Sequence, residues 1–320
     1  MINLKINKDL NVSVVVPFYN RSKFLERLLD SVEIQTLPIA KIYIIDNGST
    51  LEETLKAWKV IQTHDLCSKC LFTSTIKKNN ANYARNLGYQ LAETKYVAFL
   101  DSDDWWNREH LEKSINCLLN SNKVAVYSGA IIHTSNSIFV NQSVDINNFD
   151  NPFSLIMSPK GYIAQTSSYI VDKITLRNTV NWSEELNRHQ DFDYFAQVYY
   201  KSSGWCYCPY ANVNIDWHNG GTDINKIDYY SLIKYYEKWN HLFPSEIRKI
   251  YLGKMLFLCY QANADSSIKQ FYYNEIHKYE FISTWKDRVL FSRFYISNRA
   301  KLINLVKLLG LKEAIKKLIR

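Results

Sequence analysis

The chain has 320 residues, 47% hydrophobic and 22% charged, as in a soluble globular protein of one large or two small domains. No run approaches the roughly 20 apolar residues of a membrane-spanning helix, and the first ten residues lack the apolar segment of a secretory signal. We therefore expect a cytoplasmic protein with reduced cysteines, whose net charge of +8 makes nucleic acid and anionic membrane the partners to weigh.

The first 130 residues alternate two kinds of segment. Short runs rich in β-branched and aromatic residues predict strands at residues 12–16, 41–46, 71–76, 96–100 and 124–127. Between them, apolar residues recur at helical spacing, as they do over residues 24–32. Strands that alternate with helices indicate an α/β fold with a mostly parallel, Rossmann-like sheet flanked by helices.

The rest of the chain has two parts of different character. Residues 131–225 are irregular, with strand candidates at 166–171 and 213–217 and a helix expected near 192–200. From residue 226 the pattern is helical and rich in Tyr, Lys and Leu. We therefore expect one domain in two lobes, residues 1–130 and 131–225, and a helical C-terminal extension over residues 226–320.

The last twenty residues are basic and amphipathic. Six Lys or Arg residues stand against Glu313 in residues 301–320, and apolar residues recur at helical spacing on both sides of Gly310. Such a segment can lie on an anionic membrane surface, or it can pack on the core with its lysines in solvent. Its apolar residues argue against a nucleic-acid partner.

An acidic cluster, Asp101-Ser102-Asp103-Asp104, directly follows the apolar run at residues 96–100. Carboxylates at the end of a buried strand are costly unless positive charge is near. Hard divalent cations such as Mg²⁺ or Mn²⁺ prefer oxygen ligands of this kind, and they commonly accompany a phosphate. The alternative is a turn in which Asp104 caps a helix that starts near Asn107.

Two other predicted strands end in polar residues. The first strand runs into Pro17-Phe18-Tyr19-Asn20, and the second into Asp46-Asn47-Gly48-Ser49-Thr50. The carboxyl ends of parallel strands meet at one edge of a sheet, where α/β proteins bind ligands. Asp46 can accept hydrogen bonds from a nucleoside, and Arg85 near a helix start can face a phosphate. A plain turn with a helix cap and a surface arginine are the alternatives.

The order of these segments resembles glycosyltransferase family 2. Residues 14–20 (VVVPFYN), 44–50 (IIDNGST), 84–88 (ARNLG) and 99–106 (FLDSDDWW) carry the resemblance. It implies the GT-A fold and an inverting, metal-dependent transfer from a nucleotide-diphospho-sugar, with UDP favoured, to a glycan hydroxyl. A bacterial capsule or lipopolysaccharide would be the product. Asn47 and Asn80 depart from the residues common in the family, which leaves the nucleotide open.

The resemblance also implies roles for single residues. The residues expected at the donor are Pro17, Tyr19, Asn20, Asp46, Arg85, Asp101 and Ser102. Asp101 and Asp103 match the DXD pair that binds Mn²⁺ or Mg²⁺, and His218 is a further candidate ligand. The family division gives a nucleotide-sugar half at 1–130 and an acceptor half at 131–225. A lipid-linked acceptor would suit peripheral contact with the inner face of the plasma membrane.

Asp191 is the expected catalytic base, in the segment Arg188-His189-Gln190-Asp191 that opens a predicted helix. The resemblance implies that it takes the acceptor's hydroxyl proton as that oxygen attacks the anomeric carbon. The alternative is an acid in the first helical turn that interacts with the helix dipole. Asp193 competes for the role, but two residues further on it points away from Asp191.

Other functions fit the sequence less well. A sugar nucleotidyltransferase or a dinucleotide-dependent oxidoreductase is expected to carry a glycine-rich loop after its first strand, and residues 16–19 contain no glycine. A degenerate glycan-binding or membrane-scaffolding protein would not need the three aspartates. His64, Cys67 and Cys70, with Cys206 and Cys208, match no common zinc spacing, so we expect free thiols.

Overall fold

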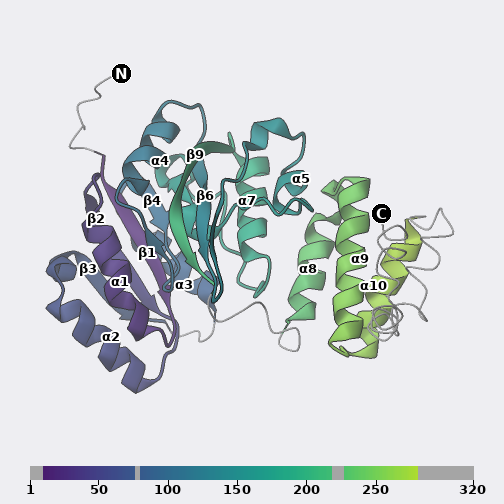
Figure 1. Cartoon of the computed structure of the whole chain (residues 1–320), viewed down its shortest axis with the longest axis horizontal. Coiled ribbons are helices and arrows are strands. Elements are labelled where there is room, and N and C mark those ends of the chain that lie inside the picture. The colour runs from purple at the N-terminus through teal and green to yellow at the C-terminus, as the bar shows by residue number, and fades with distance from the viewer. Residues whose placement is uncertain (1–9, 76–79, 218–226, 280–320) are drawn as a thin grey trace. The chain divides into compact units, whose positions relative to one another are not determined.

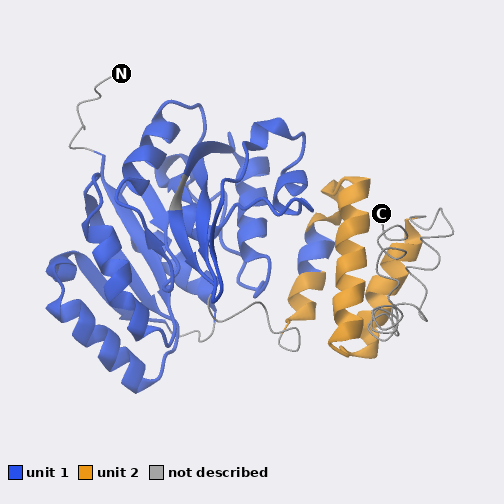
Figure 2. Cartoon of the chain, in the orientation of Figure 1, with its two compact units in different colours: residues 1–221, 234–238 blue, residues 222–233, 239–320 orange. Residues whose placement is uncertain are grey.

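The structure is a computed structural model that describes residues 10–75, 80–217 and 227–279, without the side chains of residues 211 and 212. The chain forms two compact units (Figure 2). The first comprises residues 1–221 and 234–238, and the second residues 222–233 and 239–320. The expected acidic cluster, Arg85 and Asp191 all belong to the first unit.

The N-terminal half of the first unit is a parallel sheet (Figure 1). Its strand order is β3-β2-β1-β4, with β1 Val12–Phe18, β2 Ile39–Asp46, β3 Cys70–Ser74 and β4 Tyr96–Phe99. Every residue of β1 and β4 is buried, as expected for strands covered on both faces. The four predicted strands of this half are confirmed.

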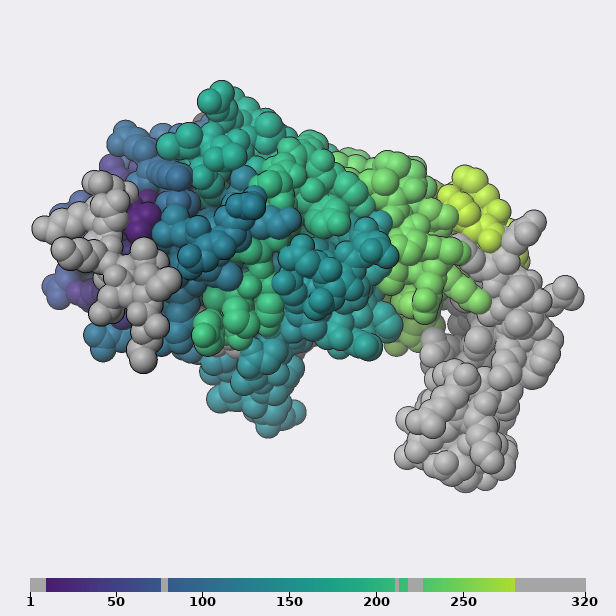
Figure 3. Space-filling model, turned by 90° about the horizontal axis from the view of Figure 1, so that it is seen from above, coloured from purple at the N-terminus to yellow at the C-terminus, as the bar shows by residue number. Residues whose placement is uncertain are grey.

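The same sheet continues past β4 with mixed strand directions. The order is β8-β6-β9-β5, with β7 beside β6, and the strands are β5 Trp105–Trp106, β6 Ala125–His133, β7 Ile138–Asn141, β8 Ile170–Asp172 and β9 Trp205–Asp216. β6 and β9 are parallel, whereas the other pairs in this half are antiparallel. Segments distant in the chain, in blue and in green, therefore share one surface of this unit (Figure 3).

Helices flank the sheet. They are α1 Ser22–Glu33, α2 Leu51–Thr63, α3 Ala81–Leu91, α4 His110–Leu119, α5 Pro152–Ile156, α6 Lys173–Leu176 and α7 Gln190–Lys201. α3 packs closely on β1, because a Cβ atom at Gly88 would lie 2.5 Å from Cγ1 of Val15. This close approach packs α3, which carries Arg85, against the parallel strands. The α/β class with flanking helices is confirmed.

Two local predictions need correction. Residues 166–168, expected as strand, form a 3₁₀ turn, because the side chain of Gln165 accepts the backbone N–H of Ser167 at 2.9 Å. The helix expected near Asn107 begins at His110 instead. Trp105 and Trp106 pair with β9 as a short strand, which delays the helix.

The second unit is helical where it is described. Its elements are α8 Tyr229–Trp239, α9 Ser245–Gln261 and α10 Ser266–Lys278, with one turn of α8, residues 234–238, grouped with the first unit. Among the described residues, no helix is both long and apolar enough to cross a membrane. The amphipathic segment at 301–320 lies outside the described residues.

Candidate active site

A pocket of about 520 Å³ opens at the carboxyl ends of the parallel strands. Its lining residues come from the ends of β1, β2 and β4 and from the starts of α3 and α7: Pro17, Phe18, Tyr19, Arg21, Asn47, Ala81, Arg85, Asp101, Ser102 and Gln190. Five of the seven residues predicted to bind donor are in this set. The other two, Asn20 and Asp46, each directly adjoin a lining residue in the chain.

Asn20 shapes the rim of the pocket. Its backbone is left-handed, with φ of 50°, a conformation that asparagine tolerates better than most residues. Its Oδ1 accepts the N–H of Thr50 at 2.9 Å, and its own N–H donates to Oγ of Ser49 at 2.9 Å. These bonds tie the end of β1 to the end of β2 and fix the neighbouring Tyr19 at the pocket.

Asp46 is buried, and its carboxylate is already used by the fold. It accepts hydrogen bonds from the N–H of Ser49 at 2.9 Å and from the hydroxyls of Thr54 at 3.0 Å and Ser74 at 3.4 Å. Thr50 caps α2 by accepting the N–H of Glu53, so the predicted turn and cap are present. The residue that lines the pocket from this strand end is the next one, Asn47.

Arg85 and Asp101 form the central ion pair of the pocket. Nη2 of the buried Arg85 lies 2.7 Å from Oδ1 of Asp101, and Nη1 donates to Oδ1 of Asn82 at 3.0 Å. The guanidinium also lies 4.6 Å from the ring centre of Trp182. Its Nε is buried and has no hydrogen-bond partner among the described residues.

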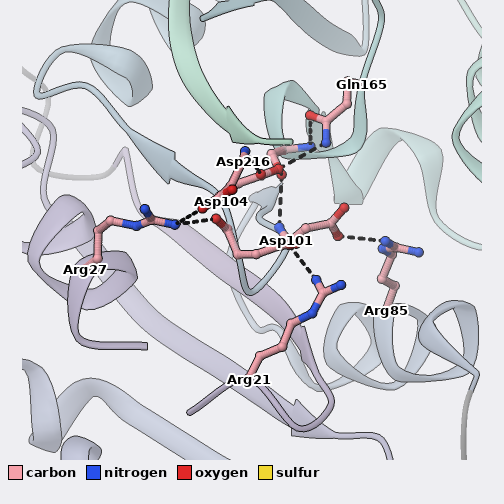
Figure 4. A network of polar contacts seen from close by, with 9 residues as sticks. Arg21, Arg27, Arg85, Asp101, Asp104, Gln165 and Asp216 are labelled. Atoms are coloured by element: carbon pink, nitrogen blue, oxygen red, sulfur yellow. Dashed lines mark hydrogen bonds and ion pairs between the residues drawn. The ribbon is translucent and has the colours of Figure 1, made fainter. Parts of the chain in front are cut away.

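Two further arginines, which the sequence analysis missed, contact the acidic cluster (Figure 4). Nη1 of Arg21 lies 2.6 Å from Oδ1 of Asp103. Nη2 of Arg27, on α1, donates to the backbone oxygen of Asp103 at 2.7 Å and to Oδ2 of Asp216 at 3.1 Å. The only sequence signal was their place just after β1, which puts the start of α1 at the ligand edge of the sheet.

Asp104 plays a structural part, and it does not cap α4. It is buried, and its Oδ2 accepts Oγ–H of Ser167 at 2.6 Å and Nε2–H of Gln165 at 3.1 Å, while Oδ1 accepts the N–H of Asp216 at 3.2 Å. Burial, and then the charges of Asp103 and Asp101, raise the pKa of Asp104 well above its ordinary value. Asp104 joins the acidic cluster to the end of β9.

Among the described residues, the cluster holds more carboxyl groups than arginines. Asp101, Asp104 and Asp216 gather around Arg21, Arg27 and Arg85 (Figure 4). Asp103 joins them through its ion pair with Arg21. Burial, together with Asp101 and Asp216, raises the pKa of Asp103, although the charge of Arg21 lowers it. Hard divalent cations prefer oxygen ligands of this kind, and the donor set therefore fits Mg²⁺ or Mn²⁺.

Asp191 lies in the first turn of α7, next to Gln190 of the pocket lining. Its Oδ1 accepts the N–H of Phe192 at 3.0 Å. Burial raises the pKa of Asp191 to about 6, against the lowering effects of that hydrogen bond and of the Arg85 charge. The charge of Asp101 raises it further. Asp191 is therefore electrostatically coupled to both members of the central ion pair, as a base at this pocket would be.

Three asparagines of the α3 segment hold the loop that leads to α7. Nδ2 of Asn80 donates to the oxygen of Glu184 at 2.7 Å, and Nδ2 of Asn82 to that of Ser183 at 2.7 Å. Nδ2 of Asn86 donates in the same way to Trp182 at 2.8 Å, and Oδ1 of Asn86 accepts the N–H of Trp182 at 2.9 Å. The sequence analysis missed this role, although asparagine inside a helix is an unusual choice that points to side-chain bonding.

His218 and the cysteine and histidine groups complete the set of candidates. His218 lies outside the described residues, so its role as a ligand stays a prediction. All six cysteines are free. Nε2 of His64 lies 3.1 Å from Oδ1 of Asp30, and with Glu33 these residues form a group of potential metal ligands that contains no cysteine.

Comparison with known proteins gives a family match that covers this site. A model described as glycosyl transferase family 2 matches residues 13–171. The matched segment contains all the predicted donor residues and the acidic cluster. It ends before α7, so Asp191 lies beyond it.

Two bacterial relatives illustrate the match in sequence. The chain is 27% identical over 192 residues to the amylovoran biosynthesis glycosyltransferase AmsB of Erwinia amylovora, covering 58% of this chain and 63% of that protein. It is 33% identical over 130 residues to a UDP-Glc:alpha-D-GlcNAc-diphosphoundecaprenol beta-1,3-glucosyltransferase, WfgD, of Escherichia coli, covering 41% and 49%. The chain thus spans less than two thirds of each relative.

Solved structures of TarS from S. aureus share the fold. The alignment to TarS has a TM-score of 0.58 at 18% identity and covers 92% of this chain and 54% of that one. A shorter form, TarS 1-349 in complex with UDP, aligns with a TM-score of 0.53 at 16% identity over 84% of this chain and 89% of that one. At this identity the likeness concerns the fold alone.

Proposed function

The chain belongs to glycosyl transferase family 2 through residues 13–171, and from this premise we propose that it is an inverting, metal-dependent hexosyltransferase. The proposed reaction moves a sugar from a nucleotide-diphospho-sugar to a hydroxyl of a glycan acceptor. One observation carries the proposal: a single pocket is lined by the buried Arg85–Asp101 pair and by Gln190, the residue that precedes the base candidate Asp191.

UDP is the favoured nucleotide of the donor. WfgD is named as an enzyme that uses UDP-Glc, and TarS 1-349 has been solved with UDP. In this chain, Pro17, Tyr19 and Asn47 line the part of the pocket formed by β1 and β2. Arg85 supplies a positive charge for the diphosphate.

Asp101 and Asp103 are the residues that would hold Mn²⁺ or Mg²⁺, with His218 as a further candidate. A bound divalent cation supplies positive charge to the departing diphosphate. The chain's own residues would assist: Arg21 and Arg27 already neutralise part of the carboxylate charge, and they hold Asp103 in place through its side chain and its backbone oxygen.

Asp191 performs the proton transfer in the proposed reaction. The acceptor oxygen forms a bond to the anomeric carbon as the bond from that carbon to the diphosphate breaks. The hydroxyl proton passes to the Asp191 carboxylate. One displacement inverts the anomeric configuration, and the transition state has oxocarbenium character as in glycoside hydrolysis. A base with a pKa of about 6 is largely ionised at neutral pH and still accepts a proton readily.

The proposed acceptor is a growing bacterial glycan, in capsule or lipopolysaccharide synthesis. The names of AmsB and WfgD refer to amylovoran biosynthesis and to a diphosphoundecaprenol-linked sugar. A lipid-linked acceptor would place the enzyme at the inner face of the plasma membrane, and the basic amphipathic segment at 301–320 suits peripheral binding there.

The test pairs donor binding with product analysis. Melting temperatures measured with UDP-, GDP-, dTDP- and CMP-sugars, each with Mn²⁺ or with EDTA, identify the donor, because a ligand of the folded state raises the melting temperature. The donor that binds is then incubated with lipid-linked acceptors, and the anomeric configuration of the product is read by NMR. A product that keeps the donor's configuration, or a shift that survives EDTA, contradicts the proposal.

A further inference from the structure

A second carboxylate of α7, Asp193, is buried two residues after the proposed base. Its side chain is fully buried, and both of its oxygens have partners. Oδ1 lies 2.7 Å from Nζ of Lys238, and Oδ2 accepts Oγ–H of Ser183 at 2.6 Å and Nε2–H of Gln197 at 2.8 Å. Nζ of Lys238 also donates to Oγ of Ser183 at 2.9 Å, which joins Asp193, Ser183 and Lys238 in a closed polar network.

This network continues to the pocket through one residue of α3. The backbone oxygen of Ser183 accepts Nδ2–H of Asn82 at 2.7 Å, and Oδ1 of Asn82 accepts Nη1–H of Arg85 at 3.0 Å. Arg85 in turn pairs with Asp101 at 2.7 Å. An unbroken series of polar contacts therefore runs from Lys238 to the central ion pair of the pocket.

The same turn of α8 also contacts the residue that starts α7. His189 precedes the helix with a left-handed backbone, φ of 55°, which is strained for a residue with a side chain. Its ring stacks on Phe192 with 4.9 Å between ring centres, and the edge of Tyr235 packs against it, also at 4.9 Å. Two side chains of α8, Tyr235 and Lys238, thus hold the turn in which Asp191 lies.

We propose that Lys238 is a positioning residue for the glycosyl transfer proposed above, acting through Asp193 and Ser183 to hold Asp191 and Arg85 in the arrangement that the reaction needs. The inference rests on the proposed function. Lys238 and Tyr235 come from residues 234–238, which lie in the C-terminal extension and well beyond the family match. One turn of that extension is therefore part of the catalytic unit.

The competing explanation is that the pair only stabilises the fold. Breaking a buried ion pair by removing one partner is strongly destabilising, whereas replacing both charges is often neutral. The test must therefore remove the charges together. Lys238→Met alone leaves Asp193 buried without its cation, and it reports on stability. Lys238→Met combined with Asp193→Asn leaves no buried charge, and the amide introduced by Asp193→Asn retains groups for Ser183 and Gln197.

Two measurements on the double variant decide between the explanations. The first is kcat, with UDP affinity measured by calorimetry in the presence of Mn²⁺. The second is the titration of the Asp191 carboxyl followed by ¹³C NMR and assigned with Asp191→Asn, which needs no acceptor. Lys234→Met is the matched control, since Lys234 is an exposed lysine in the same turn of α8.

A positioning role predicts that kcat of the folded double variant falls on the order of 10²-fold, because small displacements of reacting groups cost about that much. UDP affinity falls less than kcat, because Arg85 keeps its ion pair with Asp101, and the apparent pKa of Asp191 moves from about 6 toward the ordinary value for aspartate. A folded double variant with the kcat and the Asp191 titration of the Lys234→Met control overturns the inference. If the unmodified chain transfers no sugar, the proposed function fails, and the NMR measurement alone decides on Lys238.

Discussion

The two acidic regions of the first unit are neutralised to different degrees. Around Asp101 and Asp103, carboxyl groups outnumber arginines among the described residues, and both side chains remain about a quarter exposed. Around Asp193, which is fully buried, both carboxylate oxygens are satisfied within a network that includes a cation, a hydroxyl and an amide. The first region can bind an external cation or ligand, whereas the carboxylate oxygens of the second already have partners within the protein.

Asp191 lies between these regions and shares features of both. It belongs to the same helix turn as Asp193, yet no cation of the described chain forms an ion pair with it, and burial raises its pKa to about 6. Two carboxylates two residues apart thus have different environments because they point to different sides of α7. We infer that the carboxylate without an ion pair, Asp191, takes part in catalysis, while the fully paired Asp193 supports its position.

The largest effect is expected from removing the base. Asp191→Asn should lower kcat by about 10²- to 10⁴-fold, the range for loss of a general base, because the amide cannot accept the acceptor's proton. Donor binding should be spared, which a melting-temperature shift with the donor and Mn²⁺ checks. Asp193→Asn combined with Lys238→Met tests the paired region in the same assay, and Asp191→Asn with normal turnover would exclude Asp191 as the base.

The next effect concerns the carboxyl-rich region around Asp101 and Asp103. Asp101→Asn and Asp103→Asn should each remove most of the Mn²⁺-dependent rise in melting temperature with the donor, because each removes a carboxylate oxygen ligand. EDTA added to the unmodified protein should have the same result. Asp30→Asn is the control, because it removes a carboxylate from another group of potential metal ligands, in which Asp30 pairs with His64, and Asp30 does not line the pocket. A donor shift that survives in Asp103→Asn would contradict the metal assignment.

A smaller effect is expected from pH. Only the ionised form of Asp191 accepts a proton, so kcat should rise with pH through about 6 and level off above it. The raised pKa means that activity is lost at a higher pH than for an exposed aspartate. A rate profile measured from about pH 5 to 8 at saturating donor shows this limb. A midpoint near the ordinary aspartate value of about 4 would mean that the catalysing carboxylate is not the buried one.

The sequence predicted the site residues at the ends of the parallel strands better than the contacts that support them. Pro17, Tyr19, Arg85, Asp101 and Ser102 come from segments with recognisable local patterns, and all five line the pocket. Strand ends in a parallel sheet meet by topology alone, so their neighbours follow from the order of elements.

The supporting contacts could not be predicted, because they join residues far apart in sequence. Arg27 meets Asp216 across 189 positions, and Asn82 meets Ser183 across 101. The spacing of residues in the sequence does not indicate such pairs, because each depends on how the mixed half of the sheet packs in three dimensions. Asp46 illustrates the reverse case: its motif suggested a ligand contact, but local hydrogen bonds with Ser49 and Thr54 occupy its carboxylate.

The smallest effect concerns stability, away from both acidic regions. His110 is fully buried at the start of α4, stacked on Trp106 at 4.8 Å, and neither ring nitrogen has a hydrogen-bond partner among the described residues. Burial lowers the pKa of His110 to about 3. The folded state therefore favours the neutral ring, and the stability that this group contributes is complete above a pH of about 6.5 and is lost as pH falls toward about 3.

When the pH falls from about 7.5 to about 5, this histidine should lower the free energy of unfolding by about 2 kcal/mol. That is the free energy of keeping the ring neutral roughly 1.5 pH units below its ordinary pKa. His110→Leu, which has a similar volume and cannot ionise, should reduce the loss of unfolding free energy over that interval by about this amount. Urea unfolding at both pH values measures it. His64→Leu is the comparison, since that ring pairs with Asp30. An equal loss in His110→Leu and the unmodified chain would show that the fold does not lower the pKa of His110, so that the ring protonates in the folded protein as well.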